Sequence, residues 1–133
     1  MAKEATNKRS FCFSTGADPF NKLYLLVWKD ATNRSEPIDT IHTLITNTFY
    51  LVGVSYKYIT DGTSEARFYV DGKAGSVSTN AMGPVIYFDN ALWLGDREIA
   101  TQPLYGTMSS ARLYNQPRYA AQILQDAIDA RRN

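Results

Sequence analysis

Carboxylate pairs come first among the side chains that could do chemistry, because two carboxylates held about 5–9 Å apart can hydrolyse a glycosidic bond. The acids that could serve are scattered around predicted turns, at Glu65, Asp71, Asp96 and Glu98. Only Asp96 and Glu98 stand two positions apart, and such a pair is common at a solvated strand end. The spacing of the acids therefore predicts no glycosidase site.

His42 and Cys12 are the only histidine and the only cysteine. One histidine cannot build a multi-histidine metal site, and a Ser-His-Asp triad would rest on that single residue. Cys12 cannot form an internal disulfide, and it lies between Phe11 and Phe13. We interpret His42 as a structural histidine and Cys12 as a buried, inert thiol. With no phosphate loop, dinucleotide fingerprint or zinc spacing, the sequence predicts a protein that is not an enzyme.

Aromatic residues are the other candidates for a binding role. The chain holds nine Tyr, six Phe and two Trp. A sugar ring can stack on such a side chain while neighbouring polar groups bind its hydroxyls. Each candidate falls in a predicted strand or helix that must bury one face, so core packing competes with ligand stacking. The candidates are Trp28, Trp93, Tyr105 and Tyr119.

The charge of the chain is nearly balanced, with 14 Lys and Arg against 13 Asp and Glu. A neutral domain has no broad attraction for phosphate backbones or anionic membranes, and no stretch approaches the ~20 apolar residues of a membrane span. We therefore expect no nucleic acid and no membrane as partner. Basic residues gather only near the two ends, where they are solvated or contact a partner in an assembly. These residues are Lys8, Arg9, Arg131 and Arg132.

The elements that must position these residues are mostly strands, because 133 residues form one domain and the apolar residues recur with a period of two. In 22–29, Leu23, Leu25 and Val27 share one face while the other face is also apolar, which is typical of a strand inside a sandwich. Strands are predicted at 10–16, 22–29, 38–45, 48–58, 66–72, 74–79, 84–88, 91–95 and 104–114.

Two further patterns complete the predicted domain. The dipeptide Asp71-Gly72 suits a tight hairpin turn after an alternating strand. The apolar residues of 117–131 recur with helical spacing, which predicts one amphipathic helix that Asn115 or Gln116 caps and Pro117 begins. We expect a polar N-terminal arm at 1–9 and, over 10–133, an all-β antiparallel β-sandwich that ends in this helix.

Two stretches of the chain resemble the laminin-G-like modules of the concanavalin A-like jelly-roll superfamily. TFYLVGVSYKY followed by ARFYVDGK resembles the central hairpin of that family. ALWLGDRE followed by LYGTMSSARLYNQPRYAAQIL resembles its late strands and closing helix. The resemblance covers about residues 46–128 and implies a jelly roll. The closing pattern is matched at Gly106, Met108, Ala111, Arg112, Leu113, Tyr114 and Asn115.

The sequence also departs from that family. Ser109-Ser110 replaces the acidic pair of the closing pattern, so a role of those acids cannot be transferred. The strand pattern that usually precedes the hairpin is not recognisable before residue 46, which predicts either a pared-down domain or a sheet edge that a partner completes. Relatives often hold Ca²⁺ at a loop rim, and this resemblance makes Asp61, Asp89 and Asn90 candidates, although all three residue types are also ordinary in turns.

Two functions fit these observations. The resemblance implies a glycan- or protein-binding module. The apparent absence of front strands, the polar arm and the lack of disulfides favour instead a structural protein that assembles as a homo-oligomer, for example a decoration or cement subunit of a viral capsid or similar particle. Polar residues follow Met1, so we expect no signal peptide, synthesis in the cytoplasm and, in the second case, a place on the virion surface.

Overall fold

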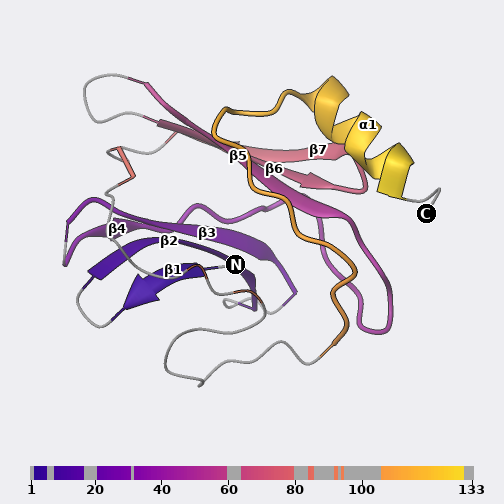
Figure 1. The fold of residues 1–133 in the computed structure, drawn as a ribbon, viewed down its shortest axis with the longest axis horizontal. Helices are drawn as coiled ribbons and strands as arrows, with labels where there is room; N and C mark the ends of the chain where they lie inside the picture. Colours follow the sequence, from indigo (N-terminus) through magenta and orange to yellow (C-terminus); the bar gives the residue numbers. More distant parts are fainter. Residues whose placement is uncertain are drawn as a thin grey trace.

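Two antiparallel sheets and one helix make up the fold in the computed structural model, which describes residues 2–5, 8–16, 21–30, 32–59, 64–79, 84–85, 92, 94 and 106–130. The first sheet has the order β1 (Ala2–Ala5), β2 (Lys8–Thr15), β3 (Leu23–Trp28), β4 (Arg34–Ser35), and the second the order β5 (Val52–Tyr58), β6 (Ser64–Val70), β7 (Lys73–Ser78). The sheets lie in two layers, with α1 (Ala120–Ala130) beside the second (Figure 1).

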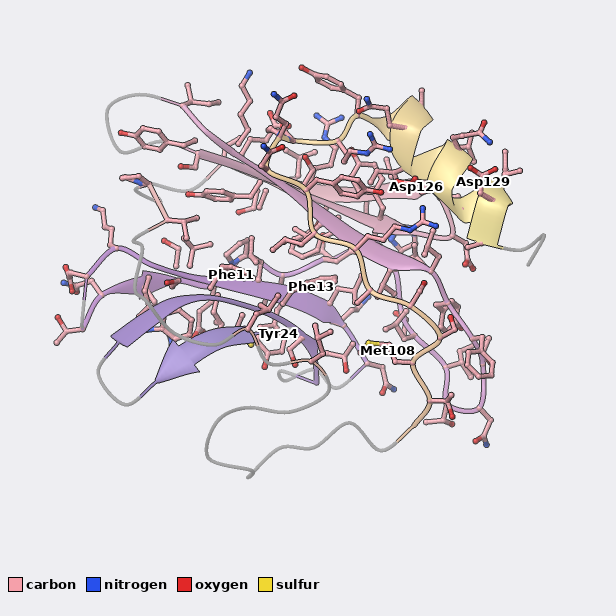
Figure 2. The ribbon with its side chains drawn as sticks, viewed as in Figure 1. Phe11, Phe13, Tyr24, Met108, Asp126 and Asp129 are labelled. Atoms are coloured by element: carbon pink, nitrogen blue, oxygen red, sulfur yellow. The ribbon has the colours of Figure 1, made fainter. Side chains whose placement is uncertain are left out.

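The core lies between the two sheets and is built from the strands with the clearest alternation. From β3, Leu23 and Leu25 face inward with Val27, and from β6, Phe68 meets them together with Ala66 and Val70. Figure 2 shows Phe13 on the side of the first sheet that faces the second sheet, and Tyr24 on its other side. On that other side Cys12, Leu26 and Trp28 are also buried, as a strand with two apolar faces predicts.

The central hairpin forms as predicted. Strands β5 and β6 pair antiparallel from Val52 with Val70 to Tyr58 with Ser64. Asp71 and Gly72 then turn the chain into β7 with φ of 51° and 78°, which is the pair of left-handed conformations that a two-residue turn requires. The Asp71 carboxylate also accepts a hydrogen bond from Leu51 N, so the turn is joined to the start of β5.

Helix α1 is shorter than predicted and starts later, at Ala120 instead of residue 117. Tyr119 is its N-cap, because the backbone N–H groups of Gln122 and Ile123 both donate to Tyr119 O. Gln122 Oε1 in turn accepts from Tyr119 N at 2.9 Å, which is half of a capping box. Asn115 and Gln116 therefore do not cap the helix. Ala127 is its one buried residue, and the Gly72 turn lies against Leu124 and Ala127.

Three predicted segments differ from the structure. Residues 2–5 form β1 and residues 8–9 begin β2, so these parts of the predicted arm pair with a neighbouring strand and are not free. Residues 38–45 form only an isolated bridge at Ile38, since side-chain bonds take the place of a ladder there. The described part of 104–114, residues 106–114, is irregular and exposed. Most of the predicted strands at 84–88 and 91–95 lies outside the described residues.

Candidate functional site

The connection between β4 and β5 carries the most exposed apolar group of the described chain. Residues 40–49, which we call the 40–49 loop, project at one end of the sandwich (Figure 1). In this loop Ile41 is 63% exposed, Ile45 67% and Phe49 78%. The exposed residues between Ile45 and Phe49 are Thr46, Asn47 and Thr48, and the loop has no Asp, Glu, Lys or Arg. It therefore presents apolar and neutral hydrogen-bonding groups together.

A fully buried carboxylate fastens the base of this loop to the second sheet. Asp39 Oδ1 accepts hydrogen bonds from Ile41 N and from Ser76 N of β7, both at 3.0 Å. Asp39 Oδ2 lies 2.7 Å from His42 Nδ1. Ser76 Oγ donates to Ile38 O and accepts from Thr40 N. We call Asp39, His42 and Ser76 the Asp39 clamp.

Burial of Asp39 by itself raises the pKa of its carboxyl group. The hydrogen bonds from Ser76 N, His42 and Ile41 N, with the charge of His42, outweigh this effect and lower the pKa below its ordinary value of 3.8. The carboxyl group is therefore ionised near neutral pH. A buried carboxylate with three donors is a satisfied and directional anchor.

Further bonds hold the loop from the side of β3. Lys22 Nζ donates to His42 O at 2.6 Å and to Thr43 Oγ1 at 2.8 Å. Leu44 N donates to Asn21 O at 2.8 Å, and the Leu44 side chain packs against the core. Ile45 N donates to the Tyr50 hydroxyl. The exposed apolar side chains of this loop thus stand on a backbone that is fixed at several points.

Although the clamp contains Asp, His and Ser, it is not arranged as a hydrolytic triad. A triad needs the serine hydroxyl to donate to the histidine. Here Ser76 Oγ is engaged with the backbone at Ile38 and Thr40. His42 Nδ1 has a partner inside the fold, the Asp39 carboxylate. The clamp instead fixes the backbone that carries the exposed side chains of the 40–49 loop.

A second polar cluster joins the closing segment (residues 106–119) to α1. Asp126 accepts from Arg112 Nη1 at 3.3 Å, from Arg118 Nη2 at 3.2 Å and from the Tyr114 hydroxyl at 3.3 Å (Figure 2 labels Asp126). The Arg118 guanidinium also lies 4.4 Å from the centre of the Tyr114 ring. We call these four residues the Asp126 cluster. All of its hydrogen bonds are long, and Arg112 is half exposed.

The predicted ligand residues do not come together. Trp28 is 2% exposed and packs with Cys12 and Leu26, so it has no face open to a ligand. Tyr119 is 72% exposed at the start of α1. Lys8 and Arg9 are strand residues of β2 whose side chains lie outside the described part. The remaining candidates also lie outside it: Trp93, Tyr105, Asp61, Asp89, Asn90, Arg131 and Arg132.

Two properties of the described ranges bear on the other predictions. No group of three or more His, Cys, Asp or Glu side chains there could hold a metal ion. The calcium prediction rests on Asp61, Asp89 and Asn90, which those ranges do not include, and it stays a prediction. No helix there is long and apolar enough to cross a membrane.

Sequence reasoning missed the 40–49 loop and the Asp39 clamp. The alternation of apolar and polar residues in 38–45 suggested a strand and concealed the exposure of Ile41 and Ile45. One signal was present in the sequence. An Asp whose side chain bonds the backbone N–H two residues later, as Asp39 bonds Ile41 N, is typical of a turn.

Comparison with known proteins agrees with this architecture. A laminin-G-like model of the concanavalin A-like lectin/glucanases superfamily matches residues 3–124. The match extends further toward the N-terminus than the resemblance over about residues 46–128. Among curated proteins, none matches this sequence.

One solved structure shares the fold, that of an S-layer domain-containing protein (residues 221–444) from Clostridium thermocellum. The TM-score is 0.51 at 12% identity over 88% of this chain, which spans 60% of the other chain. That likeness concerns the fold alone. Since the family model matches nearly the whole chain, this protein belongs to the concanavalin A-like lectin/glucanases superfamily.

Proposed function

We propose that the protein is a non-catalytic recognition module that binds a neutral glycan through the 40–49 loop. The observation that carries the proposal is the exposure of Ile41, Ile45 and Phe49 on a backbone that hydrogen bonds hold in place. Loops on a rigid scaffold are where binding residues concentrate. A loop that is already ordered loses less conformational entropy when it binds, which favours affinity.

The chemistry of the loop tip supports a neutral ligand with both apolar and hydroxyl groups. The Phe49 ring offers a face on which the C–H side of a sugar ring can stack. Thr46, Asn47 and Thr48 offer hydroxyl and amide groups beside it. The loop carries no acid, lysine or arginine, and its tip beside Phe49 offers only neutral groups, which favours a neutral ligand over a sulfated or acidic one. The Lys22 ammonium that reaches the loop is already bonded to loop oxygens.

The assembly hypothesis loses one of its supports. The N-terminal residues 2–5 pair with β2 as strand β1 and are not a free arm, while the match to a lectin/glucanase superfamily favours a binding module. We therefore place recognition first. A role as a decoration or cement subunit would require a homo-oligomer, and the experiment below distinguishes that role from recognition.

The test is a screen of the protein on a glycan array, followed by calorimetric titration of each saccharide that is retained. We expect Phe49→Ala to weaken binding at least tenfold, since it removes the stacking face while its effect on stability stays within about 0.5 kcal/mol, as for an exposed side chain. Tyr58→Ala is the matched control, because Tyr58 is an exposed aromatic residue at the far end of β5 and should not change binding.

Two outcomes would contradict the proposal. Glycan binding that survives Phe49→Ala would place the site elsewhere. Failure of every glycan, together with sedimentation of a symmetric oligomer that Phe49→Ala dissociates, would show that the loop serves self-assembly.

A further inference from the structure

We infer that the Asp39 clamp holds the 40–49 loop in its binding shape, and that loss of the clamp frees the loop while the sandwich stays folded. This inference concerns the control of the proposed binding loop and rests on that proposed function. Asp39 and Ser76 would then be positioning residues, which touch no ligand and act through the loop.

The clamp is the junction between the loop and the second sheet. One carboxylate oxygen, Asp39 Oδ1, serves both Ile41 N at the start of the loop and Ser76 N of β7. Ser76 Oγ repeats the link through Ile38 O and Thr40 N. On the other side Asp39 N donates to Leu23 O of β3 at 2.8 Å. The loop is thus tied to both sheets at its first residues.

The clamp has no space to rearrange. A Cβ atom added to Gly75 would lie 2.7 Å and 2.8 Å from the two Asp39 carboxylate oxygens and 2.8 Å from His42 Nδ1. Asp39 itself has no exposed surface. A change at Asp39 therefore cannot be absorbed by a small shift of its neighbours, and the polar groups that it leaves behind must find water by moving the loop outward.

The remaining tethers of the loop depend on the same geometry. Lys22 Nζ reaches the carbonyl of His42 and the hydroxyl of Thr43, both within four residues of Asp39. If His42 moves away with the loop, these acceptors move with it. The apolar core does not depend on the clamp in this way, because its main contacts are Leu23, Leu25 and Val27 of β3 against Phe68 and its neighbours on β6.

Amide order parameters from NMR relaxation test the inference without a ligand. In the wild-type protein we expect values of about 0.8 for residues 41–49. In Asp39→Ala, which removes both carboxylate oxygens, we expect values below about 0.6 there, while β6 stays at about 0.85. Asp30→Ala is the matched control. Asp30 also accepts hydrogen bonds from Thr32 N and Asn33 N, but these stay within its own turn. It should leave the 40–49 loop unchanged.

A milder variant covers the case in which Asp39→Ala does not fold. Ser76→Ala keeps the backbone bond to Asp39 and removes the two bonds of the hydroxyl. We expect it to lower the order parameters of Thr40 and Ile41 first. Cleavage by chymotrypsin after Phe49 under native conditions should rise at least tenfold in Asp39→Ala and should not change in Asp30→Ala.

Unchanged order in the loop of folded Asp39→Ala and Ser76→Ala would overturn the inference, even if their melting temperatures fell. The two proposals can also fail separately. If the loop becomes disordered in Asp39→Ala but the wild-type protein binds no glycan, the proposed function fails and the role of the clamp in ordering the loop stands. If a saccharide from the array binds the wild type and an Asp39→Ala variant with a disordered loop equally well, the control of binding by the clamp fails and the proposed function stands.

Discussion

The 40–49 loop and the closing segment both lack regular structure, and both expose large apolar side chains, yet they are held by different kinds of contact. The loop is fastened by the fully buried Asp39 carboxylate, which accepts hydrogen bonds from backbone N–H groups of the loop and of β7. The closing segment is fastened by ion pairs of 3.2–3.3 Å to Asp126, with Arg112 half exposed. Exposure of the side chains is therefore a poor guide to how firmly a backbone is held.

The two anchors differ because water competes with only one of them. Around Asp126, solvent can take over the hydrogen bonds that the arginines lose, and such pairs contribute little to stability. Around Asp39 no water replaces a lost partner unless the backbone moves. The energetic difference between these regions is open to measurement.

The largest effect should follow from Asp39→Ala. This change leaves Ser76 N and Ile41 N without their acceptor in a buried site, and we expect the free energy of unfolding to fall by about 3 kcal/mol. Chemical denaturation measures the change. A loss no greater than that of Asp126→Ala would remove the distinction between the two regions.

Protonation of Asp39 at low pH should destabilise the protein less than the Asp39→Ala substitution does. Because the pKa of Asp39 is lowered in the folded protein by its hydrogen bonds, which outweigh the effect of burial, the group stabilises the fold above its unfolded pKa of about 4. This contribution is lost as the pH falls through the lower, folded pKa. Melting temperatures between pH 2 and 6 should therefore fall more steeply in wild type than in Asp39→Asn. Parallel curves would argue against an ionised Asp39 clamp.

Helix α1, to which the closing segment is joined, is held in place by its packing against the Gly72 turn more than by ion pairs. Gly72→Ala places a side chain at a φ of 78° and a Cβ 2.8 Å from Leu124 Cδ1 and 3.1 Å from Leu124 Cα. We expect a loss of about 2 kcal/mol in stability. Ala74, on the same hairpin but exposed, offers Ala74→Ser as a control with little effect. Equal stability of Gly72→Ala and wild type would mean that the helix is not seated on the turn.

The smallest effect should come from Asp126→Ala. It breaks the Asp126 cluster, but its hydrogen bonds are long and its arginines are partly exposed, so we expect a loss of about 1 kcal/mol or less. Salt should reduce the difference from wild type further. A loss above about 2 kcal/mol that salt does not change would show that the cluster is as firm an anchor as Asp39.

How far the sequence predicts this molecule depends on the range of the interactions. The pairing of β5 with β6, the turn at Asp71-Gly72 and the two buried faces of β3 were all predictable, because alternation and turn chemistry are local. The N-terminal strand β1 was not, since AKEA has no apolar alternation and becomes a strand only through pairing with β2. Jelly-roll connectivity stays a prediction.

The candidate site was beyond local patterns for a similar reason. Asp39 and Ser76 lie 37 positions apart in the sequence, and no local pattern near either residue predicts their contact. The exposure of Phe49 is likewise a property of where the loop leaves the sandwich. Trp28 illustrates the converse, because an aromatic residue that could bind a sugar is used instead to fill the outer face of β3.

The shortness of β4 has a consequence for behaviour at high concentration. This strand ends the first sheet with only two residues, and Arg34 within it pairs with Glu36 directly after it. A second molecule that docked there would find almost no ladder to extend and two charges to desolvate. The chain can therefore be concentrated without this edge starting the growth of β-aggregates.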